Sequence, residues 1–171
     1  LVRRQTTGTI SFQGKPIDGL SARRRAVLGI GRSFQNPPLI EHLSVVENVM
    51  AGAFGRHDYG VLDQLTRWLK VARSEGRLEE QARAILDFMR LPGIADRPAS
   101  EIAYGQRKVV DIARALMSEP ALLLLDEPTS GLGKSEHAAM GQLLNRLMER
   151  GSITIVMVEH HMDLVRDTAT R

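Results

Sequence analysis

Residues 122–136, LLLLDEPTSGLGKSE, contain the side chains best suited to act on a phosphate group. Asp126 and Glu127 directly follow an apolar run that is typical of a buried strand. A carboxylate at the carboxyl end of such a strand can hold Mg²⁺, directly or through water. A second carboxylate can polarise a water molecule for attack on a phosphoryl group. The alternative is that Asp-Glu-Pro only ends the strand, and these residues alone favour neither interpretation.

The letters GLGKS in the same stretch offer a competing phosphate site. In a loop of the form GxxxxGK[ST], backbone N–H groups surround the phosphates and the lysine reaches the outer ones. Gly133, Lys134 and Ser135 match the second half, but Pro128 stands where the first glycine is required. Because proline has no N–H and cannot adopt a positive φ, we predict an ordinary loop that leads into a helix.

Two strands and one helix are expected to position this stretch. The apolar runs at 121–125 and 152–158 each indicate a strand buried on both faces of a sheet. Between them, Gly151 follows a helical stripe made of Met140, Leu143, Leu144, Leu147 and Met148. Strand, helix and strand at this spacing predict a parallel sheet.

The rest of the chain divides into an α/β start and a helical middle. Residues 8–17 indicate a strand and a turn, and a short helix and a strand edge follow, ending near Gln35. From about 43 to 117 the pattern is mostly helical, with two apolar stripes. The first comprises Leu78, Ala82, Ile85, Leu86 and Met89, and the second comprises Val109, Ile112, Ala113 and Leu116.

Composition excludes some classes of function. The 171 residues are 43% hydrophobic and 25% charged, which suits one globular domain with or without a subdomain. The absence of cysteine excludes disulfides and thiolate metal sites, and the spacing of Glu159, His160 and His161 makes a zinc site improbable. A net charge of +3 is weak evidence for an acidic partner, and residues 23–25 (RRR) fit a solvated face better than a nucleic-acid-binding surface.

No apolar run reaches the length of a membrane span, so any membrane role would be peripheral. The chain does not begin with Met, and we expect an internal piece of a longer protein.

Residues 102–128, IAYGQRKVVDIARALMSEPALLLLDEP, resemble the nucleotide-binding domains of ABC transporters. Residues 102–106 (IAYGQ) occupy the place of the signature motif, LSGGQ, ahead of a helix and the Walker B strand. Further matches follow the family's order: Gln35 in RSFQ as the Q-loop glutamine, residues 129–132 (TSGL) as the D-loop, and His160 as the switch histidine. The segment 29–52 and the Tyr-Gly-Gln form of the signature are most similar to branched-chain amino acid (Liv-type) importers.

The resemblance implies a fold and a division of the chain. The fold would be α/β, a partial RecA-like P-loop NTPase core with a mostly parallel sheet and an inserted α-helical subdomain. Residues 1–38 would form the partial N-terminal core that ends at the Q-loop. Residues 39–118 would form the helical subdomain that ends with the signature motif and its helix. Residues 119–171 would complete the core with Walker B, the D-loop and the switch histidine.

The resemblance also implies ATP and Mg²⁺ as cofactors and assigns site residues. Asp126 and Gln35 would hold Mg²⁺, and Glu127 would act as general base, while Gln35 contacts the attacking water and His160 contacts the γ-phosphate. The signature would bind the ATP of the opposite subunit through Ala103, Tyr104, Gly105 and Gln106.

The implied function is that of the ATPase subunit of an ABC importer, on the cytoplasmic face of a membrane. Its partners would be permease subunits, a second ABC ATPase domain and, indirectly, a solute-binding protein, but not nucleic acid. A degenerate, non-catalytic module that docks on a permease is one alternative. A soluble ABC-type ATPase acting on DNA is another, although the long coiled coil or zinc-binding cysteines of such proteins are absent.

The sequence departs from the family at three places. The family's phosphate loop (Walker A) would precede Leu1, so we expect this chain neither to bind ATP tightly nor to hydrolyse it. Ala103 replaces the signature serine and removes a hydroxyl donor. Gly133 and Lys134 replace the usual end of the D-loop, which removes a polar link across the dimer interface and loosens the entry to the next helix.

Overall fold

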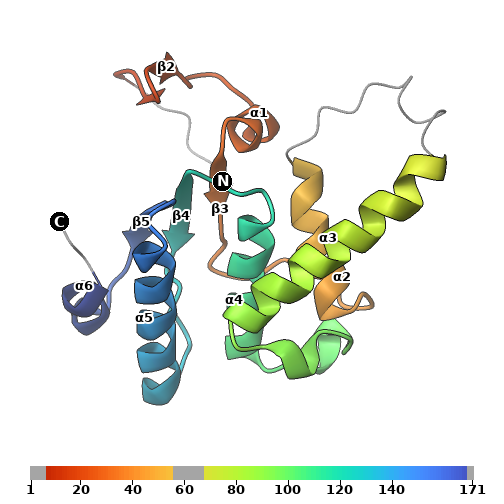
Figure 1. The fold of residues 1–171 in the computed structure, drawn as a ribbon. Coiled ribbons are helices and arrows are strands. Elements are labelled where there is room, and N and C mark those ends of the chain that lie inside the picture. The colour runs from red at the N-terminus through yellow and green to blue at the C-terminus, as the bar shows by residue number, and fades with distance from the viewer. Residues whose placement is uncertain (1–6, 56–67, 169–171) are drawn as a thin grey trace.

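The computed structural model describes residues 7–55 and 68–168, which form an α/β fold (Figure 1). An antiparallel hairpin of β1 (Ser11–Phe12) and β2 (Lys15–Pro16) comes first. Its turn places Gln13 and Gly14 at positive φ. The short helix α1 (Ala22–Val27) follows, and the Ser21 side chain accepts from the Arg24 N–H at its start. These elements agree with the predicted strand, turn and short helix.

A parallel sheet lies at the centre of the fold and has the order β3-β4-β5. Its strands are β3 (Ile30–Arg32), β4 (Leu122–Asp126) and β5 (Thr154–Val158). Asp126 is level with Val158, and Arg32 is level with Leu124. Helix α5 (Lys134–Glu149) connects β4 to β5, which confirms the predicted strand-helix-strand unit. Because the strands are parallel, the loops after Arg32, Asp126 and Val158 leave the same edge of the sheet.

The described residues in the middle of the chain are mostly helical, as predicted, while positions 56–67 of the predicted segment lie outside the described residues. The described part contains α2 (Val45–Met50), α3 (Trp68–Phe88) and α4 (Tyr104–Leu116), with 3₁₀ turns at η1 (Ala51–Gly55), η3 (Pro92–Ile94) and η4 (Ala99–Glu101). The expected stripes form the core, since Ala82, Leu86, Ile112 and Ala113 are at most 1% exposed. The last helix is α6 (Met162–Thr168), which lies beside α5. None of the helices in the described ranges is both long and apolar enough to cross a membrane.

The prediction of a strand buried on both faces is wrong for β5. In β4, Leu123 and Leu125 are fully buried against the helices. In β5, Val156 and Val158 lie on the opposite face of the sheet and are 51% and 57% exposed. Successive side chains of a strand point to opposite faces, and α4 and α5 contribute to the core on one face only. An apolar run gives both faces of a strand the same pattern. It therefore does not reveal that, among the described residues, no second layer covers the outer face of β5.

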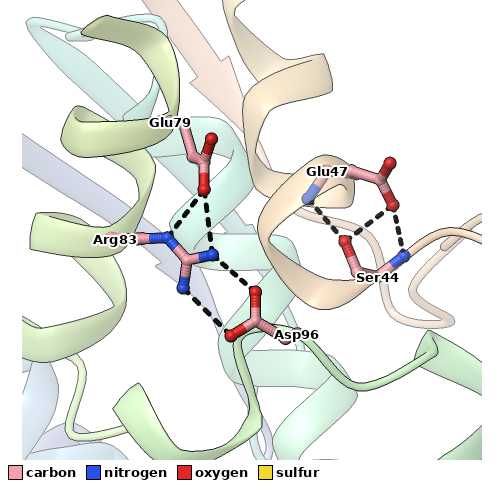
Figure 2. Close-up of polar contacts among 5 residues, drawn as sticks. All are labelled: Ser44, Glu47, Glu79, Arg83 and Asp96. Carbon is pink, nitrogen blue, oxygen red and sulfur yellow. Dashed lines mark hydrogen bonds and ion pairs between the residues drawn. The ribbon is translucent and has the colours of Figure 1, made fainter. Parts of the chain in front are cut away.

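Polar contacts hold the start of α2 and connect α3 to the loop that follows it (Figure 2). Ser44 and Glu47 form a capping box at the start of α2, and the hydroxyl and N–H of Ser44 lower the pKa of the Glu47 carboxyl. Arg83 of α3 lies between Glu79 and Asp96 and donates to both. This contact lowers the pKa of Asp96 and ties α3 to the loop that precedes α4.

Gly52 permits a close approach between η1 and the end of α4. A Cβ atom at this position would lie 1.9 Å from the carbonyl oxygen of Arg114 and 3.0 Å from the Met117 Cβ. The nearest of these atoms, the Arg114 carbonyl oxygen, belongs to helix backbone, which cannot move aside as a flexible side chain can. Gly76 differs because it is exposed within α3, and a Cβ there would meet nothing within 4 Å.

We predict that Gly52→Ala and Gly76→Ala have opposite effects on stability. Gly52→Ala should destabilise the fold by at least about 1–3 kcal/mol, because α4 must shift to relieve the overlap. Gly76→Ala should stabilise it by roughly 0.5–1 kcal/mol, because alanine favours a helix interior. Urea denaturation measures both changes, and equal effects of the two substitutions would contradict the close approach at Gly52.

Candidate functional site

Three side chains from three different loops meet at the carboxyl edge of the sheet. The Gln35 Nε2 donates to the Glu127 Oε2 at 2.8 Å, and the His160 Nε2 lies 3.1 Å from the Glu127 Oε1. The Glu127 side chain is 23% exposed, whereas that of His160 is 78% exposed. Both carboxylate oxygens are therefore oriented by a neighbour, and the group still reaches solvent. A carboxylate held in this way can accept a proton from a bound water.

The backbone of Glu127 adopts an uncommon conformation. Its φ is +48°, in the left-handed region that costs a residue other than glycine about 1–3 kcal/mol. Two hydrogen bonds oppose this cost. The Glu127 N–H donates to the Val158 carbonyl at 2.9 Å, and the Glu127 carbonyl accepts from the Lys108 Nζ at 2.9 Å. Sequence reasoning did not single out Lys108, because a lysine in an amphipathic helix usually faces solvent.

Asp126, the last residue of β4, lies in a different environment. Its Oδ2 is 3.2 Å from the Arg32 Nη2, and the two side chains are 43% and 49% exposed. Asp126 supplies the hard oxygen atoms that Mg²⁺ prefers, and the amide oxygen of Gln35 is of the same type. Across the described residues no cluster of three or more His, Asp or Glu could hold a metal ion. The donor set therefore fits Mg²⁺ only when phosphate oxygens and water complete its coordination.

The predicted signature residues lie at the start of α4, beside the Gln35 loop. Ala103 is the N-cap and provides no side-chain acceptor, but its N–H donates to the Gln106 Oε1 at 3.0 Å. The Tyr104 hydroxyl donates to the carbonyl of Gln35 at 3.4 Å. A Cβ on Gly105 would lie 2.2 Å from the Glu136 Oε1, so this position also lies against α5. A helix N-terminus of this kind favours an anion.

Residues 129–133 form the predicted loop and not a phosphate cradle. The Ser130 N–H donates to the Glu127 carbonyl, and the Leu132 N–H donates to the Thr129 carbonyl, which gives consecutive turns. Helix α5 begins at Lys134, as the interpretation of GLGKS requires. Gly133 provides no side-chain cap, and Glu136 compensates by accepting from the Gly133 N–H at 2.8 Å.

Glu159 connects this loop to the His160 segment, a role that the sequence did not reveal. One of its carboxylate oxygens accepts from the N–H and the hydroxyl of the fully buried Thr129. The other accepts from the N–H groups of His160 and His161 at 2.8 and 3.4 Å. Burial opposes ionisation, but these donors prevail and lower the pKa of the Glu159 carboxyl. The available signal was an acidic residue directly after an apolar strand.

This arrangement defines an ATP-binding cassette, and comparison with known proteins agrees. Residues 2–130 match the family described as ABC transporter, and the chain belongs to that family. A nucleotide-free ATP-binding cassette from an ABC transporter is similar in structure, with a TM-score of 0.76 and 29% identity, over 97% of this chain and 64% of that one. A dimeric ATP-binding cassette with ADP and phosphate bound, in a post-hydrolysis state, also has a TM-score of 0.76, at 25% identity over 95% of this chain and 67% of that one.

The curated relatives are ATP-binding proteins of branched-chain amino acid transport. The high-affinity transport protein BraF of Pseudomonas aeruginosa is 34% identical over 160 residues, covering 94% of this chain and 63% of its own length. LivG of Escherichia coli K12 is 30% identical over 166 residues, covering 97% of this chain and 65% of its own length. The chain therefore spans less than two thirds of the length of these relatives.

We predict that Glu159→Gln destabilises the fold in a pH-dependent manner. An amide has one acceptor oxygen where the carboxylate has two, so the loss should be about 1–3 kcal/mol at neutral pH. Because the folded-state pKa of Glu159 is lowered, its contribution is complete above the unfolded-state pKa of about 4.3 and disappears as the pH falls through the lowered value.

Urea denaturation of both forms between neutral and acidic pH measures this difference. Glu149→Gln, at the exposed end of α5, is the control and should change stability by no more than about 0.5 kcal/mol. If the difference in the free energy of unfolding between wild type and Glu159→Gln stays the same at acidic pH, the role of the carboxylate is contradicted.

Proposed function

We propose that this chain is part of the ATP-hydrolysing subunit of an ABC importer, with branched-chain amino acids as the transported solutes. The observation that carries the proposal is the Glu127 carboxylate held by Gln35 and His160 at the edge of a parallel sheet. The solute class follows from the relatives, which are named for branched-chain amino acid transport.

The proposed chemistry assigns a separate task to each side chain. Glu127 accepts a proton from the attacking water, and Gln35 orients that water through its amide group. His160, mostly exposed and within reach of Glu127, donates a hydrogen bond to the γ-phosphate. When bound, Mg²⁺ would neutralise phosphate charge. Asp126 and the amide oxygen of Gln35 would hold it, after Arg32 has released the Asp126 carboxylate.

The proposal includes a second cassette and a membrane partner. Ala103, Tyr104, Gly105 and Gln106 would contact ATP held by a second copy or a related chain, and the dimeric neighbour supports this assembly. Residues 39–118 would be the helical subdomain that docks on permease subunits, between core parts 1–38 and 119–171. A solute-binding protein would act on the far side of the membrane. The subunit would therefore be peripheral on the cytoplasmic face.

We predict that Glu127→Gln abolishes ATP hydrolysis in the complete gene product while ATP binding persists. Loss of a general base costs about 10²–10⁴ in rate, and the amide retains the size of the carboxylate. Steady-state phosphate release measures turnover, and equilibrium binding of a labelled nucleotide measures affinity. Glu149→Gln is the matched control. Wild-type protein that binds ATP without turnover would instead support the degenerate, non-catalytic module, which Ala103 favours because it cannot cap α4.

We also predict that residues 1–171 alone neither bind ATP tightly nor hydrolyse it. The sequence contains GKS at 133–135, but Pro128 prevents a phosphate loop there and no other GK[ST] occurs. Residues 1–171 therefore contain no loop of the kind whose clustered backbone N–H groups bind phosphate. Calorimetric titration and phosphate release on the purified chain provide the test. Turnover that Glu127→Gln removes would show the prediction to be wrong.

A further inference from the structure

Helix α4 carries three charged residues at intervals of three positions, Lys108, Asp111 and Arg114, which we call the polar stripe. Lys108 is 3% exposed and Asp111 is 1% exposed, while the Arg114 side chain is 20% exposed. Charges are rarely buried without partners, because desolvation is costly. The partners of these three groups therefore indicate what the polar stripe does.

Asp111 and Arg114 hold the backbone on both sides of Gln35. The Asp111 Oδ2 accepts from the Phe34 N–H at 2.8 Å, and its Oδ1 accepts from the Arg114 Nη2 at 2.6 Å. The Arg114 Nη1 donates to the Pro38 carbonyl at 2.9 Å. One carboxylate and one guanidinium thus fix the loop from the residue before Gln35 to the third residue after it.

Lys108 holds the other catalytic candidate. Its Nζ donates to the Glu127 carbonyl at 2.9 Å and lies 5.6 Å from the centre of the Tyr104 ring. Burial lowers the pKa of the Lys108 ammonium, while the charges of Glu159, Glu127 and Asp111 oppose that shift. Since Glu127 is left-handed, a donor to its carbonyl helps to keep the chain in this conformation.

The contacts form a closed circuit. Asp111 of α4 accepts from the Phe34 N–H, and Phe34 directly precedes Gln35. The Gln35 side chain donates to Glu127 at 2.8 Å, and the Glu127 carbonyl accepts from Lys108, which returns the connection to α4. Both anchors on the far side are main-chain atoms, so the helix sets the positions of the two loops and does not merely neutralise a side chain.

We infer that the polar stripe is a positioning device, in which Lys108 and Asp111 fix the Glu127 carboxylate relative to the Gln35 amide. The expected effect on kcat rests on the proposed function. The positions of Glu127 and Gln35 that the inference describes do not depend on ATP turnover. Lys108 and Asp111 do not contact the reacting atoms and act through Glu127 and Gln35.

The first test compares Lys108→Met, Lys108→Arg and Lys15→Met in the complete gene product. Methionine keeps the length of the side chain but cannot donate to the Glu127 carbonyl, whereas arginine can. Lys15 is exposed in the remote hairpin and serves as the control. We expect Lys108→Met to lower kcat about tenfold or more with KM changed less than about twofold, because misplacement acts on the transition state. Lys108→Arg should restore most of kcat, and Lys15→Met should leave it unchanged.

The second test follows amide hydrogen exchange by NMR without nucleotide. Lys108→Met should accelerate exchange at the Glu127 amide, and Asp111→Asn should accelerate it at the Phe34 amide, more than at core amides of α3. If Lys108→Met does not fold, Asp111→Asn provides the measurement at the Phe34 amide, and Lys108→Arg, which keeps the donor, should leave exchange at the Glu127 amide unchanged.

These tests separate the inference from the proposed function. Wild-type protein without hydrolysis overturns the proposed function, and hydrogen exchange then decides the inference alone. An unchanged kcat in Lys108→Met, or unchanged exchange at both amides, overturns the inference even when the wild-type protein is an active ATPase.

Discussion

The bond between Gln35 and Glu127 is the contact on which the rest of the site depends. It joins residues 92 positions apart, at 2.8 Å, and places the carboxylate within 3.1 Å of His160. Such a meeting requires parallel strands that end at one edge, and the order β3-β4-β5 provides them. The intervening helical segment does not separate the loops, because α4 returns the chain to the sheet at β4.

Much of this fold was predictable because apolar spacing reports local geometry directly. The stripe on α5 and the two strands beside it were sufficient to predict a parallel sheet, and Pro128 was sufficient to exclude a phosphate loop. The meeting of Gln35, Glu127 and His160 was expected only from the family resemblance, since no local pattern encodes contacts across the chain. The burial of β5 was predicted wrongly, because covering layers are a property of the whole molecule.

The residues that sequence reasoning missed share a physical reason. Lys108, Asp111 and Glu159 are charged and resemble solvated positions, yet each finds a main-chain partner in another segment. Charge alone predicts exposure, and only the three-dimensional arrangement reveals that a buried charge is satisfied. In α4 the local indication is an interrupted apolar stripe, because Val110, Ile112 and Ala113 are buried on either side of buried Asp111.

Asp126 and Glu127 are adjacent carboxylates in unlike surroundings, and this difference supports unlike roles. Asp126 ends a strand on the open side of the sheet and is paired with a half-exposed guanidinium. Glu127 leaves the strand through a positive φ and meets an amide and an imidazole. A carboxylate beside a guanidinium offers oxygen ligands to a metal, whereas one oriented by an amide and an imidazole is placed to contact a bound water. Because the turn at Glu127 creates this difference, the lysine that donates to its carbonyl helps to maintain the unlike surroundings of both residues.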